Sequence, residues 1–118
     1  MRIPDHPTLI RRMLQARLKK LASTTPILAA SLACYGYRCR RAGCRCRRGG
    51  PPHQTQHLTW KERNKTRAVY VAKDLIPEVR AWIAEHRRLK ELLKEIHHLS
   101  LALVRGHVQQ RRRRAGRS

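Results

Sequence analysis

Three cysteines and one histidine in a short glycine-rich segment are the residues best suited to chemistry. They are Cys39, Cys44, Cys46 and His53, spaced as Cys-x4-Cys-x-Cys-x6-His. Three thiolates and one imidazole can wrap a single tetrahedral ion, and four protein ligands leave no open coordination position. The spacing therefore predicts a structural metal site.

The metal and one of its ligands have alternatives. Cys34 and His57 lie near enough in the sequence to replace one of the four ligands. The mixed Cys/His set favours zinc over copper or an iron–sulfur cluster. Free thiols in a basic loop are the competing interpretation. We favour zinc because an arginine- and glycine-rich segment cannot order itself, whereas zinc ligation adds roughly 10 kcal/mol or more of folding free energy.

The charge of the chain indicates a polyanionic partner. The 118 residues carry a formal net charge of +21, and most of the 28 basic residues are arginines. Charge of one sign disfavours the compact state through self-repulsion, so such an excess needs another explanation. Arginine holds phosphate in bidentate fashion and stacks on bases. Nucleic acid is therefore favoured over an anionic membrane or an acidic protein, although a GC-rich genome would also raise the arginine content.

The predicted phosphate contacts fall between the metal ligands, in a predicted hairpin and near the C-terminus. They are Arg38, Arg40, Arg41, Arg45, Arg47, Arg48, Lys61, Arg63, Lys65, Arg67, Arg111, Arg112, Arg113 and Arg114. For the first group, solvation of a loop is the alternative. In the hairpin, Trp60 and Tyr70 could stack on exposed bases. Aromatic residues in strands are more often core, so we expect at least one of the two to be buried.

The elements that position these groups begin with a short amphipathic helix over residues 8–22, capped by Thr8. Residues 34–52 show no apolar periodicity and are interpreted as a metal knuckle. Two extended runs follow at residues 56–60 and 66–71, and they predict a β-hairpin that turns near Asn64.

A long helix is predicted from a cap at Asp74 to Gly106. Its apolar seam consists of Val79, Trp82, His86, Leu89, Leu93, Ile96, Ser100 and Leu103, and the stripe is widened by Ile76, Ile83, Leu92 and Leu99. Such a seam cannot remain in water. We therefore expect residues 76–103 to pair with the N-terminal helix, with a second copy of the chain or with a partner helix.

Together these elements predict an α+β fold, in which an N-terminal helix packs antiparallel on the long C-terminal helix. The zinc knuckle and the β-hairpin lie between the two helices. Residues 1–104 would form a single zinc-stapled domain. Residues 105–118 are rich in arginine, cannot bury surface, and are predicted to be a basic disordered tail.

Three motifs occur in a distinctive order: the Cys-x4-Cys-x-Cys…His set, Lys-Thr-Arg-x-Val-Tyr-Val at residues 65–71, and Val-Arg-x-Trp-Ile at residues 79–83. In this order the chain, over residues 32–103, resembles a family of short basic bacterial and archaeal proteins known only as a domain of unknown function. Some members are labelled transposase-related. The resemblance implies no assigned activity, but it slightly favours DNA over RNA and mobile-element biology over housekeeping.

Several function classes find no support in the sequence. Five of the seven acidic residues fall on the long helix, where capping and ion pairing explain them, and there is no GxxxxGK[ST] phosphate loop. Residues 1–20 lack an apolar signal stretch, and residues 21–37 are too broken to span a bilayer. We therefore expect a cytoplasmic protein that is not an enzyme, binds no small-molecule substrate and does not enter the membrane.

The resulting functional hypothesis is a non-enzymatic, zinc-stabilised nucleic-acid-binding protein that contacts the phosphate backbone through the knuckle, the hairpin and the tail. The alternative is a helical interaction subunit of a transposition or ribonucleoprotein complex. Such a subunit would have no independent nucleic-acid binding.

Overall fold

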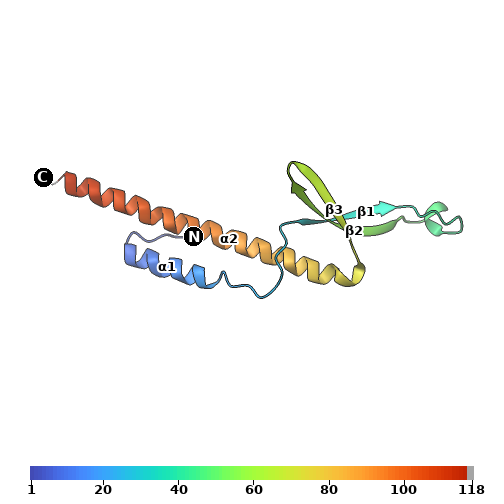
Figure 1. Ribbon diagram of the computed structural model, residues 1–118, viewed down its shortest axis with the longest axis horizontal. Coiled ribbons are helices and arrows are strands. Elements are labelled where there is room, and N and C mark those ends of the chain that lie inside the picture. The colour runs from blue at the N-terminus through green and yellow to red at the C-terminus, as the bar shows by residue number, and fades with distance from the viewer. Residues whose placement is uncertain (117–118) are drawn as a thin grey trace. The chain divides into compact units, whose positions relative to one another are not determined.

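The computed structural model describes residues 1–116, whose helices and strands are labelled in Figure 1. The elements are α1 (Pro7–Lys19), β1 (Ser31–Tyr37), β2 (His53–Glu62), β3 (Lys65–Val71) and α2 (Ile76–Ala115). The predicted α+β fold is thus confirmed, with the cysteine cluster between the two helices. The chain divides into two compact units, one of residues 25–86 and one of residues 1–24 with those from 87 onward.

The unit of residues 25–86 is built on a three-stranded antiparallel sheet in the order β1-β2-β3. The hairpin of β2 and β3 was predicted, but β1 was not. Its sequence, Ser-Leu-Ala-Cys-Tyr-Gly-Tyr, places apolar or aromatic residues on both faces, so the contrast that marks a half-buried strand is missing. Strand β1 is extended because it pairs with the longer β2, and its own sequence does not indicate a strand.

The turn between β2 and β3 confirms the predicted position near Asn64. Arg63 and Asn64 both have positive φ angles, 51° and 65°. In a two-residue hairpin loop, positive φ angles at both residues give the backbone a twist that matches the right-handed twist of the flanking strands. Asn tolerates this left-handed conformation, whereas for an ordinary L-residue such as Arg63 it costs roughly 1–2 kcal/mol.

The core of this unit lies on one face of the sheet. Leu58 and Val71 from the strands pack with Val79 and Ile83 from the first turns of α2, and partly buried residues, including Leu28, Leu32, Trp60 and Trp82, surround them. Trp60 therefore belongs to the core, as expected for one of the two hairpin aromatics. Tyr70 does not, because 59% of it is exposed.

Both helix starts differ from the predicted caps. The N-cap of α1 is His6, whose Nδ1 accepts a hydrogen bond from the backbone N–H of Thr8 at 3.2 Å. Thr8 itself lies inside the helix, because Pro7 is preorganised for the first helical position, and α1 ends at Lys19 instead of residue 22. Asp74 lies within a short 3-10 turn whose N-cap is Ala72, and α2 begins after it at Ile76.

The buried stripe of α2 is shifted from the predicted seam. Val79, Ile83, Leu92 and Leu99 are buried, whereas Leu93 is 56% exposed. Of these, Ile83, Leu92 and Leu99 were expected only to widen the stripe. A sequence with apolar residues on adjacent positions does not by itself specify which of them faces the partner; the packing of the sheet and of α1 does.

Although α2 is long, no helix in the described chain is apolar enough along its length to cross a bilayer.

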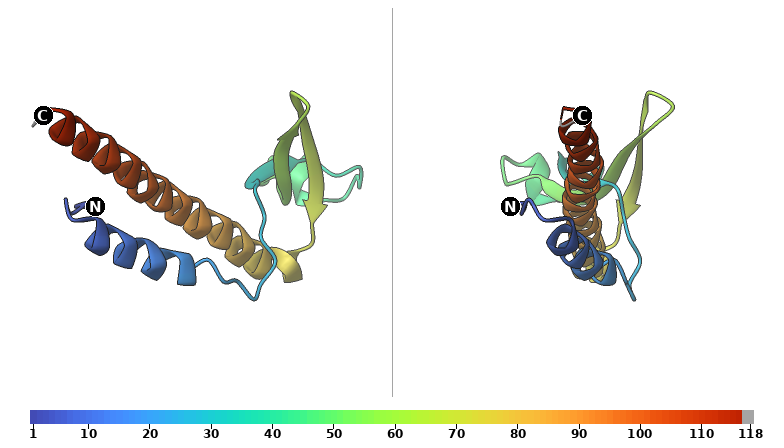
Figure 2. Two further views of the ribbon diagram at one scale, coloured as in Figure 1. Left: turned by 60° about the vertical axis from the view of Figure 1, so that its left-hand side comes forward. Right: turned by 90° about the vertical axis from the view of Figure 1, so that its left-hand side faces the viewer.

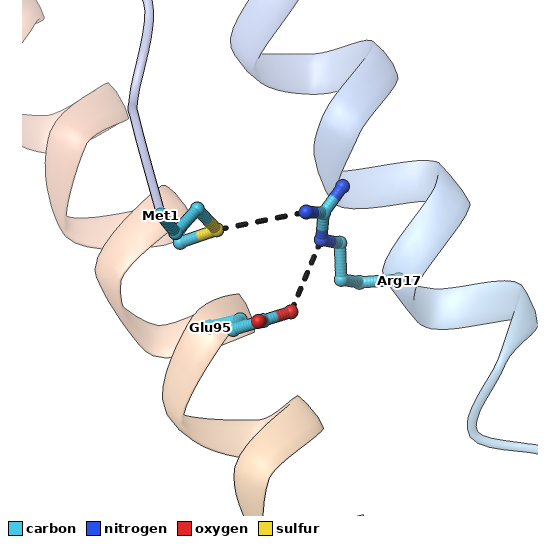
Figure 3. Close-up of polar contacts among 3 residues, drawn as sticks. All are labelled: Met1, Arg17 and Glu95. Atoms are coloured by element: carbon cyan, nitrogen blue, oxygen red, sulfur yellow. Dashed lines mark hydrogen bonds and ion pairs between the residues drawn. The ribbon is translucent and has the colours of Figure 1, made fainter.

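In the other unit, α1 lies alongside the later part of α2 and runs antiparallel to it (Figure 2). Arg17 donates from Nε to Glu95 Oε2 at 3.2 Å and from Nη2 to the sulfur of Met1 at 3.7 Å (Figure 3). Near the end of α1, Arg88 donates to the carbonyl of Lys20 at 2.8 Å. The predicted pairing of the two helices is therefore confirmed.

The end of α2 corrects the predicted tail. The helix continues past Gly106 to Ala115, so residues 105–115 are helical, not disordered. One interior glycine costs a helix only about 1 kcal/mol, and the Gln, Arg and Ala residues that follow are good helix formers. Arginines in the last turn also interact favourably with the helix dipole. Residues 117 and 118 lie outside the described residues, and a domain boundary at residue 104 stays a prediction.

The adjacent positions in α2 provide a matched test of the buried stripe. Leu99 is 0% exposed, so Leu99→Ala should lower the free energy of unfolding by about 2–5 kcal/mol. Leu93 is largely exposed, so Leu93→Ala should change it by no more than about 0.5 kcal/mol. Urea titrations followed by circular dichroism measure both. Equal losses would mean that Leu93 is buried in solution, against a second copy or in a different helix pairing.

Candidate metal centre

The four predicted ligands converge where β1 ends and β2 begins. The three cysteines lie on the loop of residues 38–52, and His53 is the first residue of β2. Their ligand atoms all lie within 4.8 Å of one another. A tetrahedral ion with metal–sulfur bonds of about 2.3 Å separates its sulfur ligands by about 3.8 Å, so the cluster has the right size. These four residues can hold a metal ion.

Two short contacts define the cluster. Cys39 Sγ lies 3.5 Å from Cys46 Sγ, and Cys44 Sγ lies 3.1 Å from His53 Nε2. The sulfur of Cys46 also accepts a hydrogen bond from the backbone N–H of Cys39 at 3.3 Å. Cys46 is 1% exposed, so the cluster is closed on one side and open on the side of His53.

The loop folds tightly around a 3-10 turn, Arg45–Arg47. Gly50 donates its backbone N–H to the carbonyl of Arg45 at 2.8 Å. A Cβ at Gly50 would lie 2.6 Å from that carbonyl oxygen, and Gly49 has a φ angle of +85°. Both positions therefore require glycine, the first because of the close approach and the second because of its backbone conformation.

Electrostatics prepare the thiols for metal binding in different ways. A hydrogen bond from the backbone of Arg41, assisted by the thiol of Cys44, lowers the pKa of Cys39 to about 6. Burial raises the pKa of the Cys46 thiol. Cys39 is thus a thiolate at neutral pH, whereas Cys46 must release a proton when a metal binds. Protons compete for Cys39 in addition to Cys46 once the pH falls through about 6, so metal affinity should fall more steeply below that pH.

Cys34, one of the two alternative ligands, is not part of the cluster. It lies in β1 opposite Gln56, and its thiol donates to Gln54 Oε1 at 3.3 Å. Side chains alternate between the faces of a sheet, so Cys34 and Gln54 share the face that carries the core, whereas His53 lies on the other face.

His57, the other alternative, is also separate. It follows His53 by four residues on the same strand, which places it about 13 Å away. Its ring packs between Tyr35 and Tyr70 at centroid distances of 5.1 and 5.9 Å. Its Nδ1 is buried and has no hydrogen-bond partner among the described residues.

Two arginines of the knuckle hold the loop together. Arg38 donates to the carbonyl of Gly50 at 3.3 Å, and Arg47 donates to the carbonyl of Arg40 at 3.1 Å. The other predicted phosphate-binding side chains of the loop are exposed and make no hydrogen bond or ion pair within the described chain. They are Arg40, Arg41, Arg45 and Arg48.

The remaining predicted contacts divide between the two units. Lys61, Arg63, Lys65 and Arg67 are exposed at and near the hairpin turn, in the same unit as the knuckle. The predicted contacts Arg111–Arg114 belong to the other unit, where they lie in the last turns of α2.

Sequence reasoning missed Tyr37, which supports His53. The two residues are paired across β1 and β2, and their rings lie 5.4 Å apart. This contact limits the positions that the imidazole ring can take beside the cysteines. The spacing of Tyr35 and Tyr37, two residues apart, is the only signal that could have placed both on one face of a strand.

The two glycines of the knuckle supply a matched test of its geometry. Gly50→Ala should weaken metal binding about ten-fold or more, because the new Cβ would displace the carbonyl of Arg45. Gly43→Ala should have little effect, because nothing lies within 4 Å of a Cβ there. Competition between the protein and a zinc indicator dye measures both affinities. Equal affinities for the two variants would contradict the tight turn at Gly50.

Comparisons with curated proteins and with solved structures give no match to this chain. A family model described as a domain of unknown function, DUF6788, matches residues 9–81. The match spans more than half of the chain and includes all three strands and all four potential ligands. It agrees with the resemblance to a family of unknown function that the motifs indicate. The chain belongs to the DUF6788 family.

Proposed function

We propose that this protein binds nucleic acid without catalysing a reaction, through a knuckle that one zinc ion holds in shape. The observation that carries the proposal is a group of exposed arginines on the ligand loop whose side chains have no partner among residues 1–116: Arg40, Arg41, Arg45 and Arg48. Residues 34–53 contain six arginines and no acidic residue. Four side chains of one sign on one small loop repel one another, and a polyanion relieves that repulsion.

Zinc is the ion that best fits the donor set. Three sulfur ligands and one imidazole nitrogen suit zinc in its structural, four-coordinate form. The loop of residues 38–52 has little core of its own, because Cys46 is the one buried residue that it contributes. Apolar burial alone therefore contributes little to its order, and ligation would supply the folding free energy.

The hairpin adds a second basic group in the same unit. Arg63 stands at the tip in a left-handed conformation that glycine adopts without strain. Strained positions of this kind are often functional. A basic side chain at such a position supports a role in binding phosphate, with Lys61, Lys65 and Arg67 beside it. The motif resemblance to a family with some members labelled transposase-related favours DNA slightly over RNA as the partner.

The second candidate is a helical interaction subunit of a transposition or ribonucleoprotein complex. Apolar side chains on the exposed side of α2 favour it: Leu93, Val104 and Val108 are 56%, 60% and 43% exposed. A partner helix or a second copy of the chain would cover them. The two candidates differ in whether the isolated chain binds nucleic acid.

Purified protein should contain about one equivalent of zinc per chain. Cys44→Ser or Cys46→Ser should lose the metal, and Cys34→Ser should retain it, because Cys34 lies outside the cluster. Metal analysis of the three variants tests this. Bound zinc should also protect the three clustered cysteines from iodoacetamide and leave Cys34, which is exposed, reactive. Full zinc content in Cys46→Ser would contradict the ligand set.

Binding to nucleic acid should depend steeply on salt. Each phosphate contact releases condensed counterions, so the logarithm of affinity falls linearly with the logarithm of salt concentration. Replacing Arg41, Arg45 and Arg48 by alanine should weaken all sequences alike and reduce the slope by about two to three. These three side chains make no hydrogen bond to the part of the chain that the structure describes, so zinc content should not change.

The matched control removes three exposed basic residues from the charge-balanced part of α2: Arg80, Arg87 and Lys90. It should leave both the affinity and the slope unchanged. Fluorescence anisotropy with labelled DNA and RNA at several salt concentrations measures all three proteins. Weak, shallow binding by the wild type, unaffected by either set of substitutions, would favour the interaction subunit instead.

A further inference from the structure

One face of the sheet is left open by the fold of its own unit. The core covers the face that carries Leu58 and Val71. The paired register of the three strands places their other side chains together on the opposite face. We call this opposite face the tyrosine face, after its three tyrosines: Tyr35 and Tyr37 from β1 and Tyr70 from β3.

The three tyrosines of this face are all accessible. Tyr35, Tyr37 and Tyr70 are 50%, 49% and 59% exposed. His57 lies between Tyr35 and Tyr70 and contacts both edge to face, with interplanar angles of 74° and 69°. These contacts place the rings of Tyr35, His57 and Tyr70 in a row across the three strands and restrict their rotation.

The rest of the face is small or polar and carries no acidic residue. Its other side chains are Ser31, Ala33, His53, Thr55, Thr59, Lys61, Thr66 and Ala68. The arginines of the knuckle begin one residue beyond Tyr37, at the end of β1. The face is thus a row of aromatic rings bordered by positive charge, which is complementary to the bases and phosphates of a polynucleotide.

A cleft beside Tyr70 adjoins this surface at the edge of the sheet, where Gln54, Gln56 and Val71 of the core face also line it. It has a volume of about 380 Å³, and its lining includes Thr55, Gln56, Tyr70 and Lys73. An amide side chain can donate to and accept from the edge of a base, and a lysine can pair with a phosphate. The cleft therefore offers polar groups next to an exposed ring.

We propose that the tyrosine face binds the unpaired bases of a single-stranded nucleic acid by stacking. The proposal rests on the proposed nucleic-acid function and names its ligand class. Every base has a π-face, so stacking on tyrosine is tolerant of sequence. In a duplex the bases are already stacked on one another and flat rings on a sheet cannot reach their faces. Preference for a single strand is therefore the distinguishing property of this surface.

The experiment compares three probes with the full, zinc-loaded chain: an oligothymidine of about 16 nucleotides, a duplex of the same length, and an abasic oligonucleotide of the same length. The abasic probe keeps the phosphates and removes the bases. We expect tighter binding of the oligothymidine than of either other probe. Equal affinity for the oligothymidine and the abasic probe would overturn the proposal.

Variants of Tyr70 connect the preference to the face. Tyr70→Ala should weaken oligothymidine binding about 5- to 100-fold and leave binding of the abasic probe unchanged. Tyr70→Phe keeps the ring and should bind like the wild type. Val69→Ala is the matched control, because Val69 is 48% exposed on the opposite face. Tyr37 is left intact because it contacts the metal ligand His53.

The outcomes separate this inference from the function on which it rests. In one outcome, all three probes bind in a salt-dependent way that Tyr70→Ala does not alter. That result would overturn the stacking role of the tyrosine face and leave the proposed function standing. No binding of any probe at low salt would overturn both. Light scattering of each variant tests whether a second copy of the chain binds the tyrosine face instead. A wild-type dimer that Tyr70→Ala converts to a monomer would assign the face to contact between copies and overturn the proposal.

Discussion

The junction between β1 and β2 is the constraint on which the sheet-bearing unit depends. Its connection, residues 38–52, is long and contains almost no apolar residue that could pack. A single cluster of four potential metal ligands lies across it, from Cys39 just after β1 to His53 at the start of β2. A slip of one residue between two strands would move every side chain to the other face of the sheet. A metal ion bound at the junction would therefore fix the register of the strands as well as the loop.

That register separates two kinds of chemistry on one sheet. Residues such as Leu58 and Val71 form the core on one face, while Tyr35, His57 and Tyr70 form a row on the other. Strand β1 contributes to both, which explains why its sequence shows no simple alternation. Within this row, Nδ1 of His57 is buried and has no hydrogen-bond partner among residues 1–116.

The cluster of four potential ligands and the hairpin could be predicted because each depends on local spacing. Cys39 to His53 is a short stretch of chain, and the turn at Asn64 needs only two residues. Strand β1, the role of Tyr37 and the need for glycine at residue 50 could not, because each depends on a partner brought close by folding. Leu92 and Leu99 are buried and Leu93 is exposed because of the surface that packs on α2. The sequence of the helix alone does not identify that surface.

The left-handed Arg63 has a consequence for how the hairpin varies. Its conformation belongs to a two-residue loop, and that loop sets the alignment of β2 with β3. Glycine at this position would give a more stable turn of the same shape. Arginine and glycine at residue 63 are thus compatible with the same strand alignment. Arginine adds a positive charge and lowers the stability of the turn, whereas glycine removes the charge and raises that stability. Natural selection can therefore adjust the charge of the hairpin without changing its architecture.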